Sequence, residues 1–208
     1  VAEDHDSNPI KMGLSRLKER EAKIIAVNPV RTGYNAIADE WVPITPGTDG
    51  LFVLSIIHEL MSAGKIDLDY LIRYTNAPWL VIRNPGGTDD GLFARDKNGK
   101  ALVWGRKTGK PVAYDKVGIV PHMSGEITLP SGQKAVPAFQ LMMDKYLDGK
   151  YAPDVVAEKT GVPAEQTRQI AAQLARVAFE EEITIDVLWT DWKGETHDKM
   201  IGRPVSFH

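Results

Sequence analysis

Two polar loops in the first quarter of the chain, at 28–32 and 47–49, carry residue types that bind nucleotides. In the first loop the asparagine amide suits a base or sugar edge, while Arg31 and Thr32 suit a phosphate. In the second, a Gly-Thr-Asp turn opens a helix, which brings backbone N–H groups and the positive end of the helix dipole beside a hydroxyl and a carboxylate. The Asp49 carboxylate suits a ribose hydroxyl or a guanine N–H. Together they predict a site that wraps a guanine, a ribose and a pyrophosphate.

Two short strands must position these loops. Residues 24–27 form an apolar run rich in β-branched types, and Asn28-Pro29 ends it because proline has no N–H to donate. A second β-rich segment at 41–44 leads through the turn TPGTDG into an apolar helix at 51–63. In open α/β sheets, ligands collect at the carboxyl ends of the strands. We therefore expect both loops, and the DSNP turn before them, to meet at one edge, although each alone also fits a strand terminator or a helix cap.

The rest of the chain alternates between helical and hairpin-forming sequence. From 76 to 136, short β-prone pieces alternate with Pro-Gly, Asn-Gly, Thr-Gly and Ser-Gly turns, which is typical of hairpins, and DKNGK at 96–100 is the clearest of them. Helical patterns predict further helices, and two apolar stretches near the end predict late strands. The helices are expected at 10–21, 66–74, 139–147, 152–159 and 164–179, and the strands at 183–188 and 205–207.

The predicted fold class is α/β, a Rossmann-like parallel sheet flanked by helices, with a β-hairpin-rich insertion. Residues 1–75 would form the first part of the nucleotide-binding domain, 76–136 the insertion and 137–208 the remainder of the domain. The chain opens without an initiator methionine and stops where a strand is due to finish. We therefore expect it to be a piece of a larger protein.

Composition limits the function classes. With 208 residues and a net charge of -3, the chain can bury a core but has no electrostatic footprint for nucleic acid. The absence of cysteine excludes disulfides, iron–sulfur ligation and a cysteine nucleophile within these residues. The sequence has no apolar run of the roughly 20 residues that span a bilayer, and no signal peptide opens it.

Other candidate residues carry weaker signals. The acidic cluster at 3–6, which includes a histidine, is better explained as a solvated loop than as a metal site, and His58, His122 and His197 as packed or surface residues. The motifs GxGxxG, GxxxxGK[ST], GxSxG and HExxH are absent. Ordinary nicotinamide, flavin, P-loop, hydrolase and zinc-protease functions therefore lose support. A non-catalytic α/β interaction module and an ordinary nucleotide-binding domain stay open as alternatives.

The run AKIIAVNPVRTGYNAIADEWVPITPGTDG resembles the third domain of the catalytic subunits of molybdopterin oxidoreductases of the dimethyl sulfoxide reductase family. Those subunits carry a D/N-P-x-x-T loop, an A-D pair and a P-G-T-D turn before an apolar helix. The resemblance extends to DSNP at 6–9, which is similar to that family's D/E-S-H-P loop, and to YAPDVVAEKTGVPAEQTRQIAAQLA. It covers most of the chain, and residues 82–129 are its least diagnostic part.

The resemblance implies that this domain holds one of two molybdopterin guanine dinucleotides that bind molybdenum or tungsten. Asn28 stands where aspartate is commoner in the family, and Asn8 where histidine is usual. The family's metal-ligating cysteine, selenocysteine or serine has no counterpart here, so no catalytic or metal residue is assigned and the piece alone is expected to be inactive. The implied cofactor-binding residues are Asp6, Ser7, Asn28, Pro29, Val30, Arg31, Thr32, Gly47, Thr48 and Asp49.

For the parent enzyme, the resemblance implies two-electron redox chemistry on a small substrate at the metal. Within the family, the hairpin insertion and the loop sequence VNPVRTGYNAIADEW favour inorganic sulfur compounds such as thiosulfate, polysulfide or sulfite as substrates. Formate and arsenic oxyanions are the alternatives. The implied partners are a membrane anchor subunit together with an iron–sulfur electron-transfer subunit. An iron–sulfur cluster in the parent would lie outside these residues. Bacterial cytoplasm and periplasm both stay open as the compartment.

Overall fold

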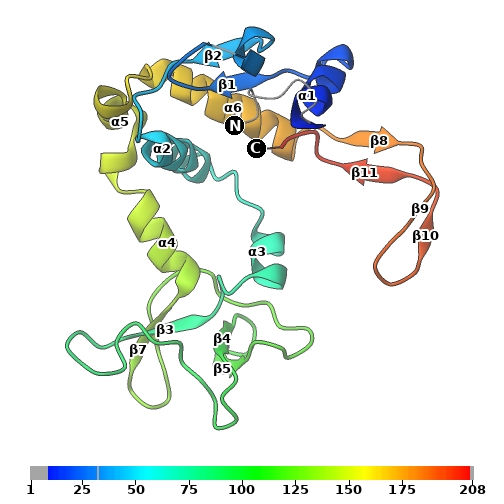
Figure 1. The fold of residues 1–208 in the computed structure, drawn as a ribbon. Coiled ribbons are helices and arrows are strands. Elements are labelled where there is room, and N and C mark those ends of the chain that lie inside the picture. The colour runs from blue at the N-terminus through cyan, green and yellow to red at the C-terminus, as the bar shows by residue number, and fades with distance from the viewer. Residues whose placement is uncertain (1–8, 32, 207–208) are drawn as a thin grey trace. The chain divides into compact units, whose positions relative to one another are not determined.

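The computed structural model describes residues 9–31 and 33–206, and the chain divides into two compact units. Unit 1 comprises Val1–Leu60 with Gly149–His208, and unit 2 comprises Met61–Asp148. Helices and small sheets occur in both units, so the α/β class is confirmed (Figure 1). None of the helices described is long and apolar enough to cross a membrane.

Unit 1 contains a parallel strand pair, β1 (Ile25–Val27) and β2 (Glu40–Val42). Between them lies a single 3-10 turn, η1 (Gly33–Ala36), and before them the helix α1 (Pro9–Glu19). The other strand pairs in the described part of the chain are antiparallel, so a larger parallel sheet of the Rossmann kind is not evident there. What the sequence predicted as a sheet is, in the described residues, one short parallel ladder.

Two helices, α2 (Asp49–Ser62) and α6 (Ala164–Phe179), share a core with β2. The segment that follows α5 (Pro153–Thr160) adds Val162 to this core. Burying each large apolar side chain stabilises the fold by about 1.5–3 kcal/mol, so this core is what holds the helices beside the strands. Its buried members come from β2, from the segments that follow β2 and α5, and from α2 and α6, and they are Val42, Ile44, Phe52, Ile56, Val162, Ile170 and Ala171.

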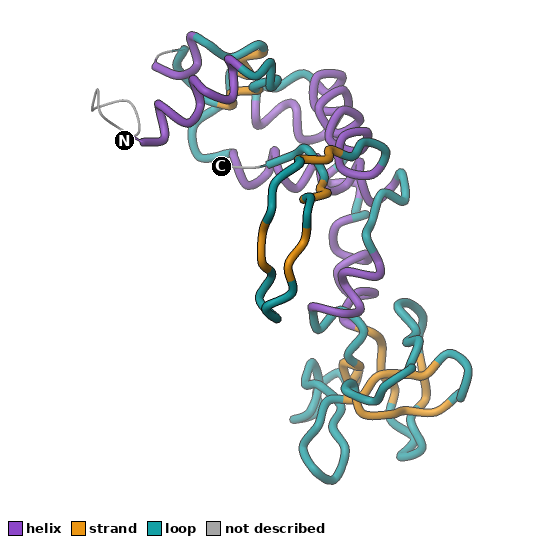
Figure 2. Tube along the Cα trace, turned by 90° about the vertical axis from the view of Figure 1, so that its right-hand side faces the viewer, coloured by secondary structure: helices purple, strands orange, loops and turns teal. Residues whose placement is uncertain are grey.

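A long two-stranded ribbon follows α6 in unit 1 (Figure 2). Its base pairs β8 (Ile183–Ile185) with β11 (Met200–Gly202), and its tip pairs β9 (Trp189–Thr190) with β10 (Thr196–His197). The strand predicted at 183–188 is thus present in its first half. The strand predicted at 205–207 is wrong for residues 205 and 206, and 207 lies outside the described residues. Proline at 204 explains this, because it cannot donate to a ladder.

Unit 2 is built from antiparallel strands and two helices, as the turn-rich sequence predicted. The strands β3 (Leu80–Arg83), β7 (Lys134–Pro137) and β6 (Ile127–Thr128) form one sheet in the order β3-β7-β6. A second ladder joins β4 (Leu102–Gly105) to β5 (Lys110–Ala113). Leu80, at the start of β3, is fully buried in their shared core.

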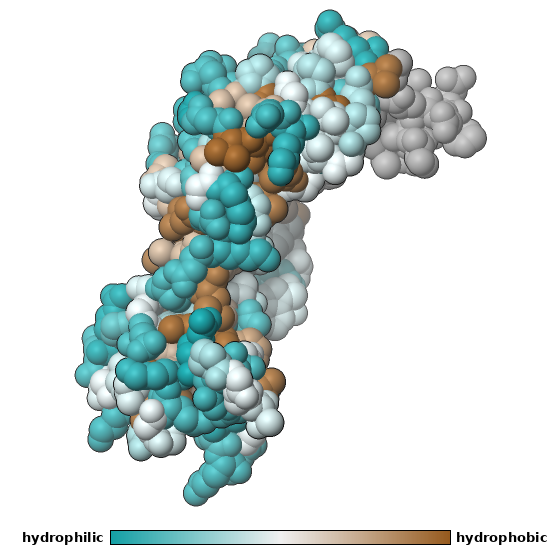
Figure 3. Space-filling model, turned by 90° about the vertical axis from the view of Figure 1, so that its left-hand side faces the viewer, coloured by the Kyte–Doolittle hydropathy of each residue, from teal (hydrophilic) through white to brown (hydrophobic). Residues whose placement is uncertain are grey.

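The helices of unit 2 are α3 (Leu68–Tyr74) and α4 (Ala138–Tyr146). Asp67 caps α3, since its carboxylate accepts from the backbone N–H of Tyr70 at 2.8 Å. Between α4 and α5 lies one more 3-10 turn, η2 (Gly149–Tyr151), which belongs to unit 1. On the face that Figure 3 draws, brown apolar patches interrupt a mostly polar surface.

Helix ends differ from the sequence-based expectation by one or two residues. The helix α2 begins at Asp49 rather than 51, because the N–H of Phe52 already bonds the carbonyl of Thr48 at 3.0 Å. The helix α1 ends at Glu19 rather than 21, and Glu21 takes a left-handed φ of 62°. By contrast, α6 spans the predicted residues 164–179.

Candidate functional site

The parallel ladder of unit 1 starts both candidate loops from one edge. Its register pairs Val27 with Val42, the last residues of β1 and β2. The ladder continues one step further, because the N–H of Asn28 donates to the carbonyl of Val42 at 3.1 Å. In a parallel pair both carboxyl ends lie at the same edge. The loops after β1 and after β2 therefore leave the sheet side by side.

Hydrogen bonds from three side chains hold the backbone of the first loop. The Asn28 side-chain oxygen accepts from the N–H of Val30 at 3.1 Å, which closes an Asx turn. The Trp41 indole N–H donates to the carbonyl of Asn28 at 2.9 Å. The Asn35 side-chain amide donates to the carbonyl of Val30 at 2.8 Å. The guanidinium of Arg31 lies over the Trp41 ring, 5.9 Å from its centroid.

The second loop is fixed to the turn that ends α5. The N–H of Thr45 donates to the carbonyl of buried Thr160 at 2.8 Å. Gly161 takes a φ of 73°, and a β-carbon there would lie 3.3 Å from the Thr45 hydroxyl oxygen. The Thr48 hydroxyl in turn donates to the carbonyl of Thr45 at 2.7 Å. The Thr-Gly-Val segment thus acts as a support for the loop, a role that its sequence alone did not reveal.

The backbone at the start of α2 is open. Gly47 takes a φ of 81°, and a β-carbon added at Gly47 or at Gly50 would meet no atom within 4 Å. Asp49 lies in the first turn of this 14-residue helix, where the helix dipole favours a negative charge. The arrangement presents a carboxylate beside open backbone.

Asp39, of the A-D pair, ties the starts of the two strands. Its carboxylate accepts from the N–H of Ile24 at 2.8 Å, and its own N–H donates to the carbonyl of Ile24 at 2.9 Å. The ammonium of Lys18 also bonds the carboxylate, and with the Ile24 N–H it holds the pKa of Asp39 below its usual range. Asp39 therefore sets the register of the parallel pair.

Comparison with known proteins gives the chain a family. No family model matches it. Over its whole length it is 42% identical to a sulfite dehydrogenase subunit of Allochromatium vinosum. It is 39% identical to the formate dehydrogenase-O major subunit of Escherichia coli over 77% of the chain, and 29% identical to the chlorate reductase alpha subunit of Ideonella dechloratans over 66%. The chain belongs to the dimethyl sulfoxide reductase family of molybdopterin oxidoreductases.

The family membership confirms the resemblance found in the sequence. The names of the three relatives describe them as subunits of oxidation–reduction enzymes. This chain spans between 15% and 22% of the length of the three named above. It thus corresponds to one part of a molybdopterin oxidoreductase subunit.

The structure starts two of the three loops that the sequence singled out from one edge of the β1–β2 pair. Asn28, Pro29, Val30 and Arg31 follow β1, and Gly47, Thr48 and Asp49 follow β2 by way of the turn at Thr45. Asp6, Ser7 and Thr32 lie outside the described residues. The sequence missed Asn35, whose side chain is fully buried, because an asparagine after Gly-Tyr gives no local signal of the carbonyl that it binds.

A cluster of Asp191, Glu195 and His197 at the tip of the ribbon has metal-ligand chemistry, with ligand atoms within 4.8 Å of one another. Its geometry is explained by the hairpin. One Asp191 oxygen accepts from the N–H groups of Lys193 and Glu195, each at 2.9 Å, and these bonds help to lower the pKa of Asp191, that from Glu195 most of all. The His197 ring stacks on Trp189, with centroids 4.7 Å apart. His197 belongs to the strand β10.

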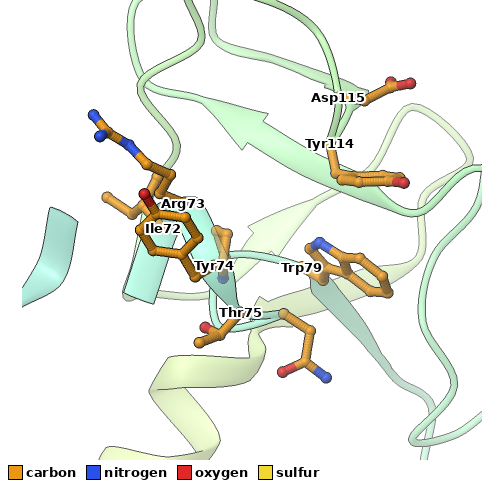
Figure 4. Close-up of a pocket in the computed structure, with 9 residues that line it drawn as sticks. Ile72, Arg73, Tyr74, Thr75, Trp79, Tyr114 and Asp115 are labelled. Carbon is orange, nitrogen blue, oxygen red and sulfur yellow. The ribbon is translucent and has the colours of Figure 1, made fainter. Parts of the chain in front are cut away.

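Unit 2 contains a pocket of about 440 Å³ with an aromatic wall (Figure 4). The rings of Trp79 and Tyr114 lie 5.0 Å apart between centroids, and Phe93 meets Trp79 edge-on at 5.2 Å. None of the predicted cofactor-binding residues that the structure describes lines it. The lining residues are Ile72, Arg73, Tyr74, Thr75, Asn76, Pro78, Trp79, Tyr114 and Asp115.

Proposed function

We propose that the edge formed by β1 and β2 binds one guanine dinucleotide arm of a bis-molybdopterin guanine dinucleotide cofactor that carries molybdenum or tungsten. The observation that carries this proposal is the parallel register of Val27 with Val42, from which both polar loops leave side by side. Family membership supports the cofactor class. The pocket lined by Trp79 in unit 2 is not part of the proposal.

The donors and acceptors of the two loops fit such an arm. Arg31 offers a planar cation to the pyrophosphate. Asp49 offers two acceptor oxygens to the N–H groups of guanine, and the open space over Gly47 and Gly50 lets a ligand approach the backbone. Asn28 uses its side-chain oxygen within the loop, so we assign its amide nitrogen to a ribose or base acceptor.

When bound, the cofactor supplies two-electron redox chemistry at its metal. The chain's own part is to bind and orient the nucleotide end. Because we assign no metal ligand to these residues, the ligand to the metal and any iron–sulfur cysteines would come from other parts of the subunit.

For the parent enzyme we propose the oxidation or reduction of a small inorganic sulfur compound. The 42% identity to a sulfite dehydrogenase subunit supports this class, and formate is the second candidate because of the 39% identity to a formate dehydrogenase major subunit. The proposed partners are a membrane anchor subunit together with an iron–sulfur electron-transfer subunit. Activity of the purified complex with sulfite but not formate would support the first class, and the reverse result would favour the second.

Calorimetry on the subunit, purified without cofactor, tests the nucleotide site. We expect GDP to bind more tightly than ADP, because only guanine offers adjacent N–H donors to the Asp49 carboxylate. Asp49→Asn should weaken GDP binding about tenfold or more, since it removes a charge-assisted hydrogen bond, and it should remove the preference over ADP. Asp154→Asn is the control, since Asp154 also lies in the first turn of a helix, α5, where it bonds Arg168.

Two results would contradict this proposal. Equal affinity for GDP and ADP in the wild-type subunit would show that the site does not distinguish guanine from adenine. Absence of GDP binding altogether would favour a non-catalytic interaction module. A cysteine cluster upstream and a second pterin-binding domain downstream in the parent gene are further expectations of the proposal.

A further inference from the structure

Both backbone polar groups of Val30 are held by asparagine side chains. Its N–H donates to the side-chain oxygen of Asn28 at 3.1 Å, and its carbonyl accepts from the side-chain nitrogen of Asn35 at 2.8 Å. The Val30 side chain itself is 58% exposed, so it contributes little packing. The backbone of the loop is therefore fixed by these hydrogen bonds rather than by burial of its side chain.

Asn35 makes this bond from an unfavourable place. Its side chain is fully buried, and its oxygen has no hydrogen-bond partner. Among the residues that the structure describes, the Ser55 hydroxyl is the other buried side-chain group without a partner. A buried acceptor without a donor lowers stability, and such a group calls for an explanation other than packing. The bond to Val30 is the contact of Asn35 that bears on the loop.

We infer that Asn35 is a positioning residue of the nucleotide site. Through the carbonyl of Val30 it fixes the loop in the form in which Asn28 and Arg31 meet the ligand. The inference rests on the proposed function, and it extends that function to a residue that does not itself touch the nucleotide.

Preorganisation is the physical basis of this role. A loop that is already ordered loses less conformational entropy when a ligand binds, so affinity rises without any new contact. Trp41 adds a second tie, since its indole N–H holds the carbonyl of Asn28 and its ring lies under Arg31. Asn35 holds the loop two residues further on, at Val30. Without Asn35, the ties from Trp41 and from the Asn28 side chain would remain, while the carbonyl of Val30 would lose its hydrogen bond.

A purely structural role and a positioning role predict different results for Asn35→Ala. If Asn35 only packs, the variant unfolds at a lower temperature and the folded fraction binds normally. If it positions the loop, affinity falls while the thermal midpoint changes little, because the variant loses a hydrogen bond and an unsatisfied acceptor together. Asn35→Leu, which keeps the branching of the side chain, separates the effect of a cavity from the loss of the amide.

The experiment measures the Kd of the cofactor-free subunit for GDP, its thermal midpoint, and hydrogen exchange of peptides covering 28–36. For both Asn35 variants we expect about five- to tenfold weaker GDP binding, in line with one lost hydrogen bond, and faster exchange in the loop. The midpoint should stay within about 2 °C of wild type. Ser55→Ala is the matched control, since it removes the other unpartnered buried group from α2, and it should leave the Kd unchanged.

Three outcomes separate this inference from the proposed function. If wild type binds GDP and both Asn35 variants bind it equally well, the positioning role is wrong and the nucleotide site stands. If Asn35→Ala loses affinity and Asn35→Leu restores both affinity and midpoint, Asn35 only fills space and the inference is also wrong. If wild type itself fails to bind GDP, both the proposed function and the inference are wrong.

Discussion

The polar loops of unit 1 are tied to residues outside each loop, whereas the hairpin turn at 96–100 of unit 2 is defined by backbone hydrogen bonds to one of its own residues. In unit 1, Thr160 binds Thr45 across more than a hundred positions, and Trp41 binds the loop at Asn28. In unit 2, the Asp96 carboxylate accepts from the N–H groups of Asn98 and Lys100, at 2.8 and 2.9 Å, inside a single hairpin turn.

This difference separates two uses of a polar turn. A hairpin turn reverses the chain, and its local hydrogen bonds are enough to define it. The turns at 28–31 and 45–48 carry additional long-range ties that chain reversal does not require, and they leave open backbone at Gly47 and Gly50. Open backbone does not set these loops apart, since a β-carbon at Gly99 would also meet no atom within 4 Å, and we take their ties to residues outside the turn as the difference from the turn at 96–100.

The largest expected effect comes from opening each core in turn. Phe52→Ala, in α2, should lower the free energy of unfolding by about 3–5 kcal/mol and abolish GDP binding, because Phe52 packs with β2. Leu80→Ala, in β3, should cost about 2–5 kcal/mol and leave GDP binding intact. Denaturant unfolding and calorimetry measure both. Loss of GDP binding in the Leu80 variant would show that the site depends on unit 2.

Two glycines with similar backbone angles allow the turn after α5 to be compared with the hairpin turn at 96–100. Gly161 has a φ of 73° and Gly99 a φ of 79°. Alanine at either position should cost about 1–2 kcal/mol in left-handed strain. Gly161→Ala also brings a β-carbon to 3.3 Å from the Thr45 hydroxyl oxygen, so it should cost more and weaken GDP binding. Thermal unfolding and calorimetry of the pair measure this, and identical behaviour would mean that the turn after α5 does not support the loop.

Two tryptophans donate equivalent hydrogen bonds to backbone carbonyls, each at 2.9 Å. Trp41 holds the carbonyl of Asn28, and Trp189 in the ribbon holds that of Lys199. Phenylalanine at either position keeps an aromatic ring and removes the donor, which should cost about 1 kcal/mol. We expect only Trp41→Phe to weaken GDP binding. A weaker Kd for the Trp189 variant would contradict the assignment of the site to the two loops.

The smallest expected effect is the loss of an exposed ion pair. The pKa values of Asp39 and Asp115 both lie below the usual range, chiefly because Lys18 and Lys100 respectively bond their carboxylates. A depressed folded-state pKa contributes stability above the unfolded value of about 3.9, and this stability is lost as the pH falls through the lower folded value.

Asp39→Asn and Asp115→Asn should each be slightly less stable than wild type at pH 7, with a difference that shrinks below about pH 4 as the wild-type carboxylates are protonated. Because Asp39 also sets the register of β1 and β2, only its variant should alter GDP affinity. Thermal midpoints from pH 7 to pH 2.5 measure the first expectation. A difference that grows in acid would reverse the assigned sign.

Local signals in the sequence predicted the parts of the fold that local chemistry decides. The Asn28-Pro29 strand end, the helix at 164–179 and the turn at 96–100 follow from proline geometry, helical spacing and Asn-Gly chemistry. The strand after 204 was wrong because an apolar stretch was weighed above a proline. The tip of the ribbon, β9 and β10, has only two residues per strand, which is too short for a periodic pattern.

The supports of the candidate site were beyond local signals. The bond from Thr45 to Thr160 joins two backbone groups, so it depends on the folded arrangement and not on residue type. The bond from Asn35 to Val30 needs the asparagine amide, but only the folded arrangement decides which carbonyl that amide meets. The side-by-side exit of the two loops was predictable from the expected parallel strands, and the register of β1 with β2 bears it out. The role of these loops in cofactor binding stays a prediction.

Hydrogen exchange of the cofactor-free subunit with and without GDP tests the central claim most directly, because it reports both loops in one measurement. We predict slower exchange on adding GDP in peptides that cover 28–36 and 45–52, with 96–100 in unit 2 unchanged. Protection confined to one loop, or spread equally over the hairpin turn at 96–100, would contradict a single nucleotide site at the shared edge of β1 and β2.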